Sequence, residues 1–106
     1  INLENECHYC VPAHTTIAGM MEVDSTLINA LLEDKALPTE KLEVLKTTTQ
    51  AILNQRGDLN DDQIARFKAV GYGNQQLLEI ILGIAQKTIS NYTNKLANTP
   101  LDDQFQ

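Results

Sequence analysis

Tryptophan is absent from this chain and cysteine is scarce, and the scarcity of cysteine argues against a disulfide-rich secreted domain. The sequence has no tryptophan, and its two cysteines are the only ones in 106 residues. Two cysteines are too few for the disulfide framework of a small secreted domain. Their close spacing instead fits a redox or metal role in a reducing compartment. We therefore predict a cytoplasmic protein.

The patterns of a membrane protein or a nucleic-acid-binding protein are also missing. The longest apolar run, Leu77 to Leu82, is interrupted by Glu79 and falls far short of the roughly 20 residues of a spanning helix. A signal peptide begins with a basic segment followed by an apolar core, and the first residues of this chain do not have that pattern. The net charge is −6, and the eight Lys and Arg are dispersed. We expect no membrane partner and no nucleic acid.

Strand patterns are absent, whereas helical patterns recur along the whole chain. There is no sustained apolar/polar alternation and no Asn-Gly or Asp-Gly hairpin turn. Apolar residues recur instead at helical spacings behind capping residues and before glycines. The sequence predicts an all-α domain whose first helix covers Cys7–Met21. The second begins at Asp24 or Ser25 and includes Leu32, the third begins at Pro38-Thr39 and is ended by Gly57, and the fourth begins at Asn60, with Gln63 as a capping box, and stops at Gly71. The last covers 75–97, is capped by Asn74 and is followed by a frayed tail from Thr99.

The last predicted helix is apolar on more than one side. Leu77, Leu78, Ile80, Ile81 and Leu82 point over more than half of the helix circumference at 3.6 residues per turn. One set of these residues is therefore expected to pack inside the domain and another under neighbouring helices or a second subunit. A domain of this length buries a modest share of its surface, which also favours a homo-oligomer.

All the cysteine and histidine of the chain lies between Cys7 and His14, in the pattern C-x-x-C-x-x-x-H. Pro12 is tolerated only in the first turn of a helix, which places the helix start near Cys7 to Cys10. A helix N-terminus favours a thiolate, and His14, one turn beyond Cys10, can accept its proton or stand beside it as imidazolium. Cys7 is close enough to form a disulfide with Cys10, so one sulfur can attack while the other resolves.

Other chemistries fit this pattern less well. Structural zinc needs four ligands, and His8 should point away from Cys7, Cys10 and His14, so we expect no metal. Haem attachment needs His directly after the second cysteine, where Val11 stands. A thioredoxin fold needs a strand before the motif. Isolated cysteines are commonly inert core residues, and an inert pair remains the alternative to redox chemistry.

The order of motifs resembles a known family. The run N-E-C-H-Y-C-V-P-A-H-T-T-I-A, followed by G-D-L-N-D-D-Q-I-A-R-F-K-A-V-G-Y-G-N-Q-Q-L-L-E-I-I-L-G-I-A and N-K-L-A-N-T-P-L-D, is similar to the alkylhydroperoxidase D-like branch of the carboxymuconolactone decarboxylase family. The likeness covers nearly the whole chain. It implies a compact antiparallel helical domain over residues 1–106, one that lacks an upstream helix.

The resemblance implies an antioxidant peroxidase, a thiol-dependent hydroperoxide reductase with no cofactor. Cys10 would match the thiolate that meets the hydroperoxide, Cys7 its partner cysteine, and His14 the residue that takes the proton. A dithiol reductant or a partner peroxiredoxin would supply electrons, and the chains would assemble into homo-trimers or hexamers. The decarboxylase branch lacks the cysteine pair, so decarboxylation is disfavoured.

The chain departs from the family in two places. The family's relay Glu lies about three helical turns before the first cysteine, a spacing that neither Glu4 nor Glu6 meets. Tyr9 stands where some members have His. The alternative from another class is a non-catalytic helical oligomerisation module with a structural or metal-binding cysteine pair.

Overall fold

The computed structural model describes residues 1–106 and contains five α-helices, one short 3₁₀ helix and no strand. The prediction of an all-α chain is confirmed. None of the helices combines the length and the apolar character needed to cross a membrane. In chain order the elements are α1 (Cys10–Met20), α2 (Ser25–Leu32), α3 (Glu40–Asn54), α4 (Asp61–Ala69), α5 (Asn74–Ala97) and η1 (Asp103–Phe105).

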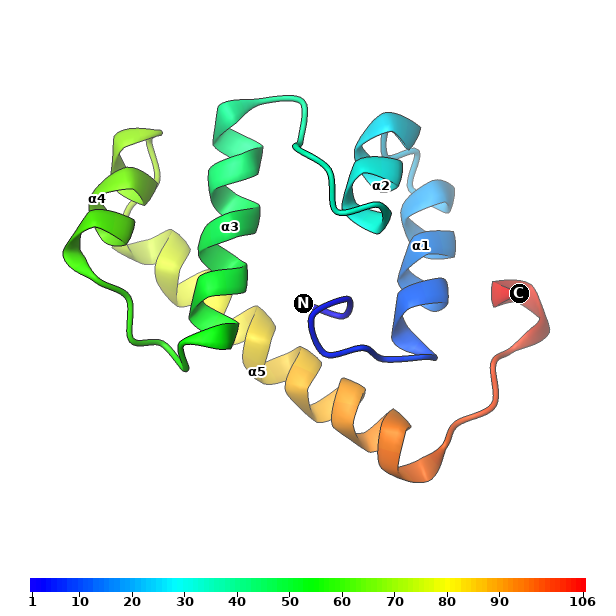
Figure 1. Ribbon diagram of the computed structural model, residues 1–106. Helices are drawn as coiled ribbons and strands as arrows, with labels where there is room; N and C mark the ends of the chain where they lie inside the picture. The colour runs from blue at the N-terminus through cyan, green and yellow to red at the C-terminus, as the bar shows by residue number, and fades with distance from the viewer.

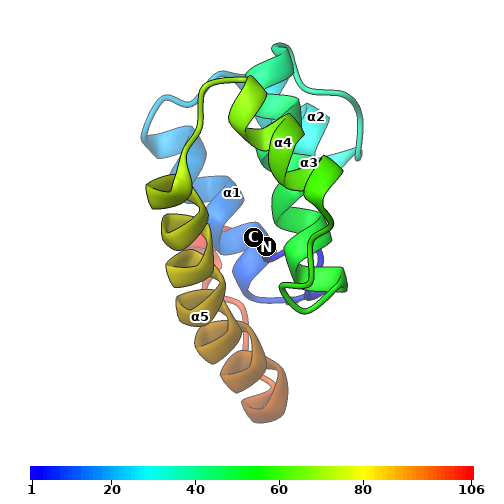
Figure 2. The ribbon, with the colours of Figure 1, turned by 90° about the vertical axis from the view of Figure 1, so that its left-hand side faces the viewer.

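Helix α5 connects the two ends of the molecule. Figure 1 shows α3 and α4 at one end and α1 and α2 at the other, with α5 running beneath both. Seen from the side, α5 follows one edge, and α3 and α4 lie together on the opposite side (Figure 2). The N-terminal segment enters the middle of the molecule, between α3 and α1 (Figure 1). Residues on α5 can therefore contact the first residues of the chain.

Three helices begin at the capping residues that the sequence predicts. The Asp24 side chain accepts a hydrogen bond from the backbone of Thr26 at 2.8 Å, and Thr39 caps α3. Asn60 and Gln63 form a reciprocal capping box at the start of α4. Each cap satisfies backbone N–H groups that have no partner inside the helix. These starts are set by residues next to them in the chain.

Other boundaries differ from the prediction. Helix α1 begins at Cys10, within the expected range from Cys7 to Cys10, but it ends at Met20 and not at Met21. Helix α3 ends at Asn54, three residues before Gly57. Gly73, not Asn74, is the N-cap of α5, and its N–H donates to the Gln76 side chain at 2.7 Å. This bond is the half of a capping box that needs no side chain on the cap residue.

The hydrophobic core is small and lies between α3, α4 and the first half of α5. It consists of Val44, Ile52, Phe67 and Ile80, and the Phe67 ring stacks on Tyr72 with centroids 4.6 Å apart. Only nine of the 106 residues are buried. The stability of the fold therefore depends on few side chains.

The tail beyond α5 is packed, which makes the expectation of a frayed end wrong. Asn98 adopts a left-handed conformation with φ of 49°, and the N–H of Thr99 donates to the carbonyl of Asn94 at 3.1 Å. This C-cap reverses the chain. The tail then runs back along α1 to η1 (Figure 1).

Candidate functional site

The two cysteines lie at the start of α1 and are joined by a disulfide. Their Cα atoms are 5.2 Å apart. Cys10 is the first residue of α1, and Cys7 lies in the turn before it. Cys7 is 1% exposed and Cys10 is 3% exposed. The prediction that these cysteines are close enough to pair is confirmed, and the pair is shielded from solvent.

Each sulfur of the pair accepts a hydrogen bond. The backbone N–H of Cys10 donates to the Cys7 sulfur at 3.1 Å. The Asn94 side chain, on the last turn of α5, donates to the Cys10 sulfur at 3.4 Å. Hydrogen-bond donors at these positions favour negative charge on sulfur. Both sulfurs of the disulfide therefore already have a donor beside them.

Three asparagines tie the N-terminal loop to α5. The Asn91 side chain is completely buried, accepts from Asn5 at 2.9 Å and donates to Asn2 at 2.9 Å. Both polar groups of its amide therefore have partners, as a buried amide requires. Lys95 adds a bond to the backbone carbonyl of Asn5 at 3.1 Å. Cys7 follows this anchored loop directly, so α5 helps to fix its position.

His14 lies one turn beyond Cys10 on α1, but its hydrogen bond goes elsewhere. Its Nε2 is 2.9 Å from the Lys87 ammonium, which donates, and neither sulfur is bonded to the ring. Partial removal from water, and secondarily the charge of Lys87, hold the pKa of His14 below its ordinary value of 6.5. The ring is therefore neutral at neutral pH, with Nδ1 carrying its proton. A neutral imidazole can act as a base, whereas the predicted alternative of an imidazolium is disfavoured.

The C-terminal strap, residues 99–106, is held by the two residues between the cysteines. His8 Nε2 lies 2.9 Å from the carbonyl oxygen of Thr99. The Tyr9 hydroxyl donates to Asp102 at 2.6 Å, and the resulting bond raises the pKa of Tyr9. The Tyr9 ring also meets Phe105 edge to face at 6.1 Å. The strap is thus attached directly to the cysteine loop.

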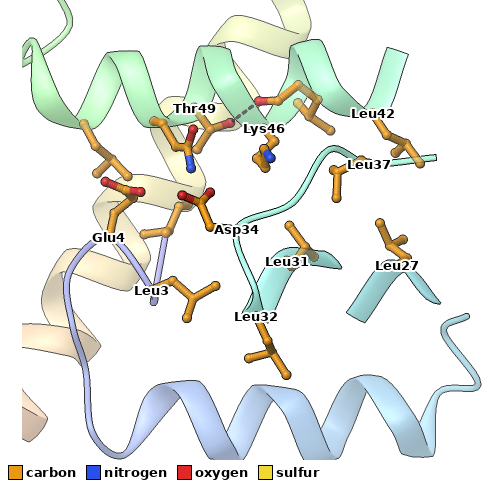
Figure 3. Close-up of a pocket in the computed structure, with 14 residues that line it drawn as sticks. Leu3, Glu4, Leu27, Leu31, Leu32, Asp34, Leu37, Leu42, Lys46 and Thr49 are labelled. Carbon is orange, nitrogen blue, oxygen red and sulfur yellow. Dashed lines mark hydrogen bonds between the residues drawn. The ribbon is translucent and has the colours of Figure 1, made fainter. Parts of the chain in front are cut away.

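Two apolar cavities adjoin the N-terminal segment, and one of them reaches His14. The smaller, about 340 Å³, is lined by His14, Val11 and Ala18 of α1 together with α2 and residues 1–3. The larger, about 450 Å³, lies between α2 and α3. In Figure 3 Leu27 and Leu31 of α2 point toward α3, Leu32 points toward α1, and the Glu4 and Asp34 carboxylates approach the same part of the cavity. The two cavities share Ile1, Leu3, Leu31 and Leu32, so they are neighbours on either side of these side chains.

Sequence reasoning missed the contributions of α5 to the site. Lys87, Asn91 and Asn94 contact His14, the N-terminal loop and Cys10, respectively. They continue the helical spacing of the core residues Ile80 and Ile84. The sequence signal for these contacts is an inward-facing row on α5 that changes from apolar to polar residues. A buried polar side chain needs a hydrogen-bond partner, so such a row indicates polar contacts with another segment.

The arrangement contains no group of three or more His, Cys, Asp or Glu side chains that could hold a metal ion. No protein-family model and no curated protein matches the chain.

Proposed function

We propose that this chain is a thiol-disulfide oxidoreductase of the alkylhydroperoxidase D-like type that reduces hydroperoxides in a reducing, cytoplasmic compartment. The observation that carries the proposal is the Cys7–Cys10 pair at the start of α1, with a hydrogen-bond donor on each sulfur. A pair at a helix N-terminus supports thiolate formation. The two sulfurs can interconvert between dithiol and disulfide without a cofactor.

The proposed cycle has three balanced steps. The Cys10 thiolate attacks the terminal oxygen of the hydroperoxide, so an S–O bond forms, the O–O bond breaks, and the alkoxide leaves and takes up a proton as the alcohol. The Cys7 thiol then displaces water from the Cys10 sulfenic acid, giving the disulfide. An external dithiol, or a partner peroxiredoxin in its dithiol form, reduces this disulfide and is itself oxidised.

Residues around the pair have separate proposed roles. His14, neutral and one turn away, takes the proton of the Cys10 thiol on Nε2 once the Lys87 ammonium moves off that nitrogen, and Asn94 stabilises the thiolate through its N–H. The apolar cavity beside His14 accommodates the organic part of the hydroperoxide, because its volume of about 340 Å³ lies in the range of small-molecule sites.

A structural role for the disulfide is the second candidate. The specific observation in its favour is burial, since Cys7 and Cys10 are 1% and 3% exposed. A buried bridge of this kind would fasten the N-terminal loop to α1 in a non-catalytic helical oligomerisation module. A metal-binding role for the same cysteines would need ligands from a second chain.

Thiol titration separates the two candidates. The fully reduced protein is mixed with one equivalent of tert-butyl hydroperoxide, and free thiols are counted before and after. We expect two thiols per chain to disappear at a rate well above that of free cysteine. A count that stays at two, or a loss no faster than that of free cysteine, would contradict the peroxidase proposal and leave the structural role.

Two cysteine variants show which sulfur attacks. In Cys7→Ser, we expect one thiol to be lost and a sulfenic acid to be trapped by dimedone, because no resolving thiol remains. In Cys10→Ser, thiol loss should slow by about 100-fold or more, since the attacking sulfur is gone. The reverse pattern would exchange the roles of the two cysteines.

The role of His14 predicts a change in the pH dependence of alkylation. Replacing His14 with Ala should raise the apparent pKa of the reduced Cys10 thiol and slow iodoacetamide alkylation near pH 7 by roughly three- to tenfold. In the wild type, the contribution of His14 should disappear as the pH falls through its lowered pKa, because the ring becomes protonated. The measurement is the alkylation rate from pH 5 to 9.

Lys87→Met is the matched variant for this prediction. Removing the ammonium takes away one of the two causes that lower the His14 pKa, so the acid limb should move to higher pH. Identical pH profiles for wild type, His14→Ala and Lys87→Met would remove His14 from the mechanism.

A further inference from the structure

Helix α5 carries a regular apolar row on the face that points away from the domain. Its members follow one another at alternating intervals of four and three residues, the spacing of a helix-pairing seam. The five large side chains among them are between 55% and 90% exposed. We call this row the α5 seam: Leu78, Leu82, Ala85, Ile89, Tyr92 and Leu96.

The rest of the domain leaves the α5 seam uncovered. The buried residues of α5, Ile80 and Asn91, lie on the other side of the helix. Consequently α5 has one face that completes its own domain and a second apolar face without a partner. This is the division expected from the spread of apolar residues around the helix.

We propose that two copies of this chain associate by packing their α5 seams against each other in antiparallel orientation. The proposal goes beyond the redox function and does not depend on it. A two-fold contact of this kind closes on itself as a dimer, or forms part of an even-numbered assembly such as a hexamer, but it does not generate a trimer.

The exposed area of the chain matches what such a contact needs. A compact monomer of 11.8 kDa is expected to expose about 5,900 Å². This chain exposes 7133 Å², an excess of roughly 1,200 Å² over that value. A standard interface removes roughly 600–800 Å² from each partner. The excess is therefore large enough to supply one complete interface.

The order of side chains along the α5 seam favours the antiparallel orientation. When the two helices are centred midway between Ala85 and Ile89, Ala85, the smallest residue of the seam, faces Ile89 of the other copy. The same alignment sets Leu82 against Tyr92 and Leu78 against Leu96. A parallel pair would instead place Ala85 on Ala85 and Tyr92 on Tyr92, leaving a void in one layer and crowding in another.

Charge does not oppose this pairing. The helix has three charged residues, and one of them, Lys87, faces the domain and bonds to His14. In the antiparallel alignment, Glu79 lies beside Thr93 of the other copy and Lys95 beside its Ile81. No like charges meet across the contact, which is the arrangement that association requires.

The first test measures mass in solution. We expect wild-type protein at micromolar concentrations to sediment as a dimer or an even multiple. Leu82→Glu and Ile89→Glu should each raise the dissociation constant of this contact by about 100-fold or more, because a carboxylate would be buried without a partner. Met20→Glu is the control, since Met20 is 76% exposed and lies on α1. Its mass should equal that of the wild type.

The second test determines orientation and does not rely on the Glu variants folding. One tagged chain carries Leu78→Cys, and a second chain with a different tag carries Leu96→Cys. The two are mixed, reduced and then oxidised. Cross-links between the two different chains support the antiparallel contact. Cross-links only between like chains, a wild-type monomer, or an assembly unaffected by both Glu variants would overturn it.

Discussion

Removing residues 100–106 will make the Cys7–Cys10 disulfide easier to reduce, by about 10- to 30-fold in rate. The truncation deletes the acceptor of the Tyr9 hydroxyl and the ring that meets Tyr9 edge to face. An exposed hydrogen bond and an aromatic contact of this kind together shift the opening of the strap by about ten- to thirtyfold. We expect the strap to leave before a reductant reaches the buried pair, so its removal should raise the rate by about that factor. The measurement is the rate of thiol appearance in dithiothreitol.

The truncation is placed after Thr99 for a structural reason. It keeps the backbone bond from Thr99 to Asn94, so the last turn of α5 and the donor to the Cys10 sulfur stay in place. Tyr9→Phe is the matched control, because it keeps the ring contact and loses only the bond to Asp102. Its reduction rate should lie between those of the wild type and the truncated chain. Equal rates for all three proteins would show that the strap does not limit access.

Phe67→Ala will lower the free energy of unfolding by roughly 3–5 kcal/mol. Phe67 is fully buried and stacks on Tyr72, and the core contains only three other buried residues. The whole free energy of unfolding of a small domain is about 5–15 kcal/mol, so the variant should be partly unfolded at 37 °C. Urea denaturation followed by circular dichroism gives the value.

Tyr72→Phe is the control for the loss of core packing. It keeps the stacked ring and removes only a surface bond from the Tyr72 hydroxyl to the carbonyl of Lys41. We expect a change of less than about 0.5 kcal/mol, as for most surface changes. A loss below about 1 kcal/mol for Phe67→Ala would mean that this residue does not anchor the core.

The sequence predicts the helices well where neighbouring residues determine them. Asp24, Thr39 and Asn60 begin their helices as expected, because a cap bonds to backbone only two or three residues away. The cysteine pair follows from the same locality, since a three-residue separation at a helix start brings the sulfurs together. The predicted C-terminal ends of α1 and α3 are less accurate, because the final turn of a helix depends on backbone conformations that several residues can adopt.

The tertiary structure decided what surrounds the cysteine pair. Asn94 is 84 residues from Cys10 in the chain, and Asp102 is 93 residues from Tyr9. No local pattern links such residues, because their contacts exist only once α5 crosses beneath α1 and the chain reverses at Asn98. The sequence by itself determined an all-α chain, a cysteine spacing that allows a disulfide and a last helix with two apolar faces. Long-range packing decided which face of that helix was buried, that His14 bonds to Lys87, and that the strap lies against the cysteine loop.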